Sequence, residues 1–183
     1  GFLTNGAAYN STNGGNVLLD GTDDYVLMSP VVNLNNVTQF SYSSFVNFST
    51  SVGAYNSFFT YSVVGQQTND QVFLWEKSTN NIILIVKNNT ITPGATLFYP
   101  APSNWVNMCV VYNGSLSTNA DKLKLYINSV QQTLNFGTYN VPANTSTLVS
   151  PRLHLGAYIT FGGFYFTGKM ATTTFYNRAL NDA

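Results

Sequence analysis

Short runs of β-branched and aromatic residues recur along this chain, separated by clusters of Asn, Gly, Ser and Pro. The run 122–128 alternates: Leu123, Leu125 and Ile127 fall on one face, and polar residues and Tyr126 fall on the other. Such alternation is typical of a half-buried antiparallel strand. No segment keeps a helical apolar period, and Ala, Glu and Lys are scarce. About ten strands with turn signals at short intervals predict an all-β, antiparallel two-sheet sandwich.

Eight further segments share this composition and are predicted as strands. They cover 25–28, 39–48, 57–62, 71–76, 82–87, 105–112, 152–155 and 168–177. No linker, repeat or block of charge divides the 183 residues, so we expect a single domain over 1–183. Because the chain begins with Gly1 rather than methionine, we expect that it is processed, or is excised from or part of a longer polypeptide.

Charged residues are scarce. They make up 8% of the chain, against about 25% in a typical globular domain, and the formal net charge is zero. This balance excludes the basic surface expected of a nucleic-acid-binding protein. A neutral surface rich in Asn, Thr and Tyr suits sugars or dense protein assemblies better. No apolar run approaches the ~18 residues of a membrane span, so we expect no membrane insertion.

Cys109 is the only cysteine and lies in an apolar, strand-like segment. A single cysteine can form neither an intrachain disulfide nor a cysteine metal cluster. We expect it to pack as a small buried hydrophobic residue.

Three of the seven acidic residues crowd into five positions: Asp20, Asp23 and Asp24 surround Gly21 and Thr22. Carboxylates at this density either hydrogen-bond a tight turn or coordinate a hard cation such as calcium. In the first interpretation, Asp20 caps a turn that Gly21 permits, and Asp24 anchors a neighbouring loop. In the second, all three aspartates supply carboxylate oxygens to calcium, and backbone carbonyls complete the shell. The local sequence leaves both interpretations open.

Six segments, in order along the chain, resemble the motifs of laminin-G-like, concanavalin A-like jelly-roll domains. They are DGTDDYV (20–26), TQFSYSSFV (38–46), WVNMCVVYNG (105–114), LYIN (125–128), LHLG (153–156) and FTGKMA with FYNRAL (166–171 and 175–180). Phe45 stands where tryptophan is usual in the family, and Ser129 replaces a glycine. The resemblance implies two antiparallel sheets, one of them concave. It also implies a domain of the kind that accompanies secreted enzymes, adhesins, and phage tail or capsid proteins, most of which have no catalysis of their own.

The chain lacks the residues that a hydrolase needs. Glycosidases use two carboxylates that flank the scissile bond, but Glu76 is the only glutamate and the nearest carboxylate, Asp70, lies six residues away. A nucleophilic triad needs a histidine or an equivalent base. The one histidine, His154, lies between two leucines and is expected to be a structural or surface residue. We therefore predict that the domain is not an enzyme and has no catalytic residues.

Sugar binding typically needs aromatic faces together with amide, carboxylate or backbone groups. Two aromatic stretches and the tyrosine after the aspartates meet this description, which makes the candidate carbohydrate-binding residues Tyr25, Trp75, Tyr158, Phe161 and Tyr165. The alternative is that these rings form the core or contact neighbouring subunits.

These observations predict a lectin-like, non-catalytic carbohydrate-binding or adhesion module on a virion or cell surface, such as a fibre, decoration or adhesin domain. Its expected partners are cell-surface or polysaccharide glycans, with further copies of itself or other virion proteins as additional partners. The alternative is a purely structural component of a virion or surface assembly that binds no glycan. Both interpretations place the domain outside the cell, on a virion or cell surface or in secreted form. Calcium, at Asp20, Asp23 and Asp24, is the one cofactor that the sequence suggests.

Overall fold

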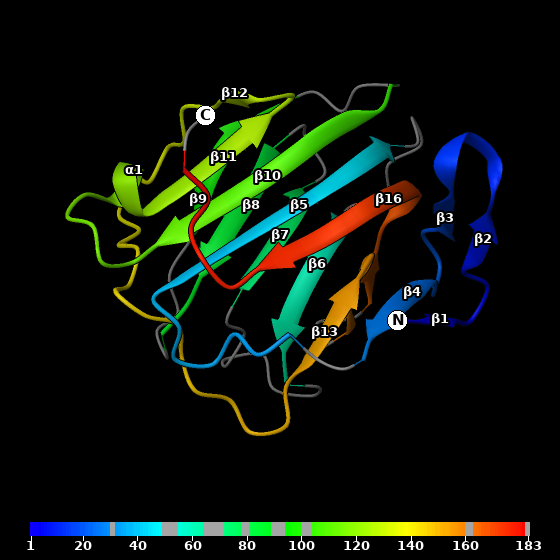
Figure 1. Ribbon diagram of the computed structural model, residues 1–183, viewed down its shortest axis with the longest axis horizontal. Helices are drawn as coiled ribbons and strands as arrows, with labels where there is room; N and C mark the ends of the chain where they lie inside the picture. Colours follow the sequence, from blue (N-terminus) through cyan, green and yellow to red (C-terminus); the bar gives the residue numbers. More distant parts are fainter. Residues whose placement is uncertain are drawn as a thin grey trace.

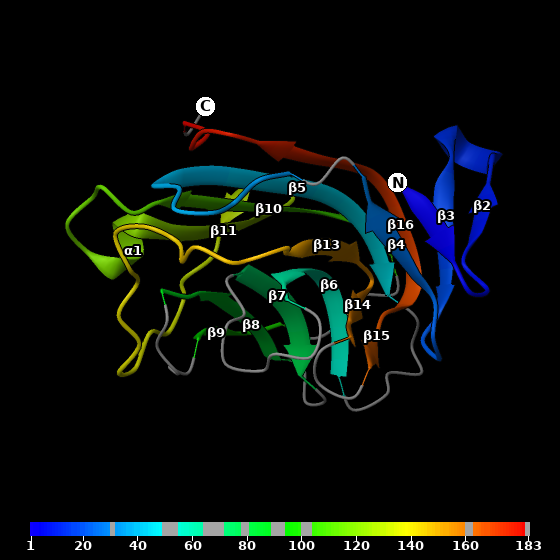
Figure 2. The same ribbon diagram turned by 90° about the horizontal axis from the view of Figure 1, so that it is seen from below.

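Two seven-stranded sheets pack face to face in the computed structural model of the chain (Figure 1 and Figure 2). The structure describes residues 1–29, 32–48, 55–63, 72–77, 81–88, 94–99, 104–159 and 163–181. The first sheet has the order β1 (Phe2–Thr4), β4 (Tyr25–Met28), β13 (Arg152–Leu155), β6 (Tyr55–Ser62), β7 (Val72–Lys77), β8 (Asn81–Val86) and β9 (Ala95–Phe98).

The second sheet has the order β12 (Val130–Gln131), β11 (Leu123–Ile127), β10 (Val106–Asn113), β5 (Gln39–Phe48), β16 (Thr167–Tyr176), β3 (Asn16–Asp20) and β2 (Ala8–Asn10). The pairings in both sheets are antiparallel. Because consecutive strands of the chain cross repeatedly between the sheets, the predicted jelly-roll sandwich is confirmed.

Three short elements lie outside these sheets. A two-stranded ladder, β14 (Ala157–Tyr158) with β15 (Phe164–Tyr165), lies beside β6 (Figure 2). One helical turn, α1 (Asn119–Lys122), precedes β11, and one 3₁₀ turn covers Thr12–Gly14. In the described part of the chain, no helix has the length and apolar character needed to cross a membrane.

Period-two alternation determines which side chains enter the core. Leu123, Leu125 and Ile127 are buried, whereas Lys124 and Tyr126 between them are partly exposed, as the sequence predicted. Strand β10 alternates in the same way, and this overturns the expectation for Cys109. The cysteine belongs to the outward set of β10 and is only half-buried.

Two clusters of aromatic rings join the sheets. In one, Tyr42 lies 4.3 Å from Phe59 and 5.0 Å from Phe175, measured between ring centroids. In the other, Phe58 of the first sheet lies 5.3 Å from both Phe48 and Phe166. Aromatic pairs at such distances stabilise a fold by about 0.5–1.5 kcal/mol beyond the area they bury. Aromatic rings therefore form much of the contact between the two sheets.

The long connection between β12 and β13 is held by a buried phenol. The Tyr139 hydroxyl accepts a hydrogen bond from the Val86 backbone N–H at 2.8 Å and donates one to the Val86 carbonyl at 2.6 Å. Tyr139 is 1% exposed. This single side chain therefore completes both backbone hydrogen bonds of Val86, the last residue of β8.

Removing that hydroxyl should destabilise the fold. Tyr139→Phe leaves two buried backbone groups of Val86 without their partner, which costs about 1–3 kcal/mol for each group. We expect the free energy of unfolding in urea to fall by about 3 kcal/mol. Tyr126→Phe, which removes a surface hydroxyl 3.4 Å from Gln131, is the matched control and should cost under about 1 kcal/mol. Equal losses in the two variants would contradict the bridging role of Tyr139.

His154 lies in the middle of β13, on the opposite face from the core residues Leu153 and Leu155. It is nevertheless buried, and its ring meets the Tyr25 ring edge-on at 5.4 Å between centroids. Burial, with a smaller contribution from the Arg152 charge, lowers the pKa of His154 from 6.5 to about 4. The histidine is therefore neutral in the folded protein at neutral pH, and its role here is structural.

The lowered pKa makes stability depend on pH. The unfolded chain takes up the proton near pH 6.5, whereas the folded chain takes it up only near pH 4. Between these values, the free energy of unfolding should fall as the pH falls, by up to about 1.4 kcal/mol per pH unit. Urea unfolding of the native protein and of His154→Gln at a series of pH values measures this contribution. Parallel profiles for the two proteins would show that His154 contributes nothing.

Candidate functional site

The acidic loop, residues 20–24, connects the end of β3 to the start of β4. Gly21 has a φ of +82°, a left-handed conformation that suits glycine. The Thr167 hydroxyl lies so close to Gly21 that a side chain there would clash with it. Asp20 is paired with Thr167 across β3 and β16. The turn is therefore built against the first residue of β16.

The three predicted carboxylates come together in this loop. One oxygen of each aspartate lies within 4.8 Å of an oxygen of the other two. Asp20 and Asp23 are exposed, whereas Asp24 is 2% exposed. This spacing allows three carboxylate oxygens to reach one ion.

Hydrogen bonds within the loop account for part of this arrangement. Asp20 Oδ1 accepts a hydrogen bond from the Thr22 N–H at 2.7 Å, as in an Asx turn, and Asp24 Oδ2 accepts one from the Asp20 N–H at 2.9 Å. The Asn5 side chain donates to the Asp23 carbonyl at 2.6 Å. Asp24 thus stabilises the acidic loop through its hydrogen bond with the Asp20 N–H.

Asp24 Oδ1 is the exception, because it is buried and has no hydrogen-bond partner. It faces Gly6, where an added Cβ would lie 2.8 Å away. A buried carboxylate oxygen without a partner is costly unless a cation or a donor reaches it. The residues of the acidic loop therefore fit a hard cation, with Asp24 as the buried ligand and Asp20 and Asp23 at the surface.

A groove with a volume of about 560 Å³ lies beside the acidic loop; we call it the polar groove after the polar side chains that reach it, although apolar groups make up more of its lining. It is lined by Gly6, Ala8, Leu18, Leu19, Asp20, Asp24, Asn47, Thr167, Gly168 and Lys169. Register places Lys169 between Leu18 and Asn47, on three adjacent strands. Its polar groups, a hydroxyl, an amide, an ammonium and two carboxylates, are of the kinds that hydrogen-bond sugar hydroxyls.

The sequence did not indicate the groove residues Asn47, Thr167 and Lys169 as site residues. Thr167 and Lys169 belong to the FTGKMA motif, which is the one signal that could have pointed to them. Asn47 lies in a long strand with no local sign of function. Only the pairing of β16 with both β3 and β5 brings these residues together.

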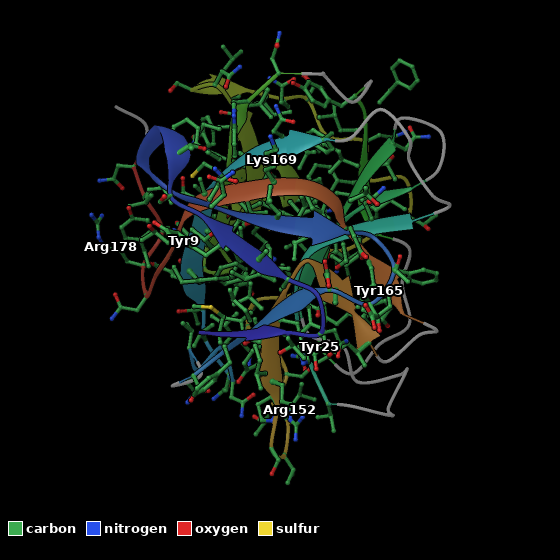
Figure 3. All side chains as sticks on the ribbon, turned by 90° about the vertical axis from the view of Figure 1, so that its right-hand side faces the viewer. Tyr9, Tyr25, Arg152, Tyr165, Lys169 and Arg178 are labelled. Carbon is green, nitrogen blue, oxygen red and sulfur yellow. The ribbon has the colours of Figure 1, made fainter. Side chains whose placement is uncertain are left out.

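Tyr25 and Tyr165 lie on the same side of the molecule (Figure 3). Tyr25 begins β4 directly after the acidic loop, and Tyr165 ends β15. Burial raises the pKa of Tyr165, and the nearby Tyr25 phenol and Asp23 carboxylate raise it further. Both tyrosines are partly exposed. Tyr165 is therefore close enough in space to interact electrostatically with Asp23 and Tyr25, although it is distant from both in sequence.

The other predicted aromatic residues lie elsewhere or outside what is described. Tyr158 is 4% exposed, and its ring centroid lies 6.0 Å from that of Phe164. Its ring face is thus not presented at the surface. Trp75 lies in β7, but its side chain is not among the described ones, and Phe161 falls outside the described residues.

Solved structures with this fold come from several kinds of protein. A heptameric pentraxin from Limulus polyphemus is 14% identical, with 91% of this chain and 77% of that one covered and a TM-score of 0.60. Domain 4 of the extracellular arabinanase AbnA from Geobacillus stearothermophilus, in complex with arabinotriose, is 18% identical, with 98% and 79% covered and a TM-score of 0.68.

The binding domain of botulinum neurotoxin serotype D is 12% identical and has a TM-score of 0.69. The alignment covers 99% of this chain but 44% of the toxin domain, so the chain spans less than half of that domain. At these identities the likeness shows the fold alone. Comparison with curated proteins yields no match.

A sequence profile gives the relationship that these structures cannot. The profile described as the concanavalin A-like lectin/glucanases superfamily matches residues 20–183, from the acidic loop to the end of the chain. The match includes β4–β16, and therefore most strands of both sheets. The chain belongs to the concanavalin A-like lectin/glucanases superfamily.

Proposed function

We propose that this domain is a non-catalytic carbohydrate-binding module that acts in adhesion on an extracellular surface. The observation that carries the proposal is the proximity of Tyr165 to Tyr25 and Asp23, on one side of the molecule where the polar groove borders the acidic loop (Figure 3). Partly exposed tyrosine rings can stack on the apolar face of a pyranose, while the groove supplies groups for its hydroxyls. Such a combination suits a sugar better than an anionic polymer or a peptide.

The arabinotriose complex of AbnA domain 4 supports the proposal by analogy, because that domain shares the fold and its structure contains an oligosaccharide. The neutral, weakly charged composition is also consistent with a glycan partner. A shallow site of this kind binds one sugar weakly, and affinity grows when many copies are displayed together. A virion or cell surface, in a fibre, decoration or adhesin protein, would provide that display.

Calcium binding by the acidic loop is the second part of the proposal. The buried, unpartnered Asp24 Oδ1 favours a cation over turn chemistry alone, because hydrogen bonds within the loop leave that oxygen unused. Asp20, Asp23 and Asp24 would be the carboxylate ligands. Bound calcium would offset two of the three negative charges of the loop and fix the start of β4, where Tyr25 lies.

One observation favours the alternative of a structural assembly component. Phe45 and Trp105 are 44% and 38% exposed; Phe45 lies in β5, and Trp105 directly precedes β10, the neighbouring strand of the second sheet. Phe45 points outward, because Val46 beside it is buried. Exposed aromatic residues of this kind are enriched in protein interfaces. A second copy or another virion protein could cover them without any glycan.

A glycan array of the multimerised domain tests carbohydrate binding. We expect defined glycans to bind, and we expect Tyr165→Ala and Tyr25→Ala to weaken that binding about tenfold, which corresponds to about 1.4 kcal/mol. Tyr176→Ala removes an exposed tyrosine from the second sheet and should leave binding unchanged. A blank array, or full binding by both variants at normal stability, would overturn the proposal. A blank array would favour the structural alternative.

Thermal unfolding with calcium and with EDTA tests the metal site. A ligand present at 100 times its Kd stabilises the folded state by about 2.7 kcal/mol, so calcium should raise the melting temperature by several degrees. Asp24→Asn and Asp23→Asn should abolish that increase.

The control for the calcium test is Asp121→Asn, which alters an aspartate of α1 outside the acidic loop. It should keep the full calcium response. Identical melting curves for the native protein with calcium and with EDTA would reduce the acidic loop to turn chemistry.

A further inference from the structure

A separate pocket opens beside the start of β5, between the β4–β5 connection and the residue that follows β16. Its volume is about 330 Å³, and it shares no lining residue with the polar groove. None of its lining residues carries a charge. Its polar lining consists of four amides and one hydroxyl, from Asn33, Asn36, Thr38, Gln39 and Asn177. We call it the amide pocket.

Hydrogen bonds within the protein occupy the oxygens of these amides and so fix their orientation. Asn33 Oδ1 accepts from the Asn35 N–H at 3.0 Å and from the Tyr61 hydroxyl at 3.3 Å. Gln39 Oε1 accepts from the Ala179 N–H at 3.3 Å. Because the oxygen of each amide has to face its donor, the nitrogen is the end that is left for a ligand.

Asn36 is fixed in the same way, since its Oδ1 accepts from the side-chain amide of Asn144. Within the described residues, the side-chain nitrogens of Asn33, Asn36 and Gln39 have no hydrogen-bond partner. Asn33 and Asn36 are exposed and Gln39 is partly exposed, so a molecule in the pocket can reach them. The amide pocket therefore offers three NH₂ groups whose oxygens are already used.

The backbone on both sides of the pocket is held in place. On one side, the Asn36 N–H donates to the Ser146 carbonyl at 3.0 Å. On the other side, the Ser41 hydroxyl donates to the Arg178 carbonyl at 3.0 Å, which anchors the residue next to Asn177. A site that is ordered before binding loses less conformational entropy when a ligand binds.

The free groups of the pocket determine the chemistry of its ligand. Several N–H donors are best matched by a group with two or more acceptor oxygens, and hydrogen bonds to a charged acceptor are the stronger ones. Because no lining residue is acidic, the wall of the pocket contains no carboxylate to repel an anion. The volume lies at the lower end of the range for small-molecule sites, about 300–1,000 Å³.

From these observations we infer that the amide pocket binds a small organic anion through a carboxylate or sulfate group, which accepts hydrogen bonds from Asn33, Asn36 and Gln39. This inference is independent of glycan binding, because the amide pocket and the polar groove share no lining residue.

Acetate and sulfate are the probes for this site, and chloride at the same ionic strength is the reference. In a titration of the whole domain followed by NMR of the side-chain NH₂ groups, millimolar acetate or sulfate should shift the signals of Asn33, Asn36 and Gln39. Chloride should shift them far less. A response to acetate alone assigns a carboxylate ligand, and a response to sulfate alone assigns a sulfate ester.

Two variants test the contacts. Gln39→Glu and Asn36→Asp each replace a donor with an anionic oxygen, but they keep the acceptor oxygen that the side chain uses within the fold. Each should weaken binding about tenfold or more, because a hydrogen bond to the anion becomes a repulsion. Asn10→Asp makes the same change of charge in β2, outside the pocket, and should bind as the native protein does.

Three outcomes would overturn the inference. The first is an equal response to chloride and to both probes, which would reflect ionic strength alone. The second is unchanged affinity in both Gln39→Glu and Asn36→Asp. The third is the absence of shifts with either probe, which would mean that the pocket holds water only. The comparison with chloride in the native protein decides the question even if a variant does not fold.

Discussion

The ring cluster of Phe48, Phe58 and Phe166 fixes the part of the molecule on which the candidate site depends. Phe166 is fully buried, with its ring centroid 5.3 Å from that of Phe58 and 5.9 Å from that of Phe48. It occupies the single position between β15 and β16. Because Phe166 is anchored in the core, Tyr165 and Thr167 on either side of it are held at the edge of the sandwich. Tyr165 lies near Tyr25, and Thr167 packs against Gly21 of the acidic loop.

At the opposite end of the fold, hydrogen bonds between uncharged groups hold two long connections together. The Asn35 side-chain amide bonds both backbone groups of Leu148, as a neighbouring strand would. Its oxygen accepts from the Leu148 N–H at 3.1 Å, and its Nδ2 donates to the Leu148 carbonyl at 2.9 Å. The Thr145 hydroxyl accepts from the Val37 N–H at 2.9 Å and donates to the Leu34 carbonyl at 2.5 Å. These contacts tie the β12–β13 connection to the β4–β5 connection. A chain with so few charges can thus order long loops with Asn and Thr, its most frequent polar residues.

The acidic loop lies at one end of β3. Asn16 begins this strand, and Asp20 ends it and opens the acidic loop. Both ends contain a buried acceptor oxygen without a partner, on Asn16 and on Asp24. Such atoms are uncommon in folded proteins because each one is costly. Further atoms of this kind belong to Tyr42, Ser57 and His154, but Asp24 Oδ1 is the one that lies in a cluster of three carboxylates, and this is the physical reason to look for a cation there.

The sequence by itself determined the fold class and the main strands. The alternation in 122–128 predicted the buried face of β11, and the predicted segments 25–28, 39–48 and 152–155 coincide with β4, β5 and β13. It missed β3 and β9, which have five and four residues, and also strands of two or three residues, such as β1, β12 and β14. Segments this short show too little of a period to be recognised. Lys122, predicted as strand, ends α1 because the Thr118 side chain accepts from the Asp121 N–H and caps that turn.

The acidic loop was visible because its residues are adjacent in sequence. Only the tertiary structure decided which other side chains join it. Tyr165 lies near Tyr25, and Lys169 reaches the polar groove, because strands far apart in the chain pair or pack together. Local sequence encodes the period of a strand, but which strands become neighbours depends on how both sheets bury their apolar faces at once.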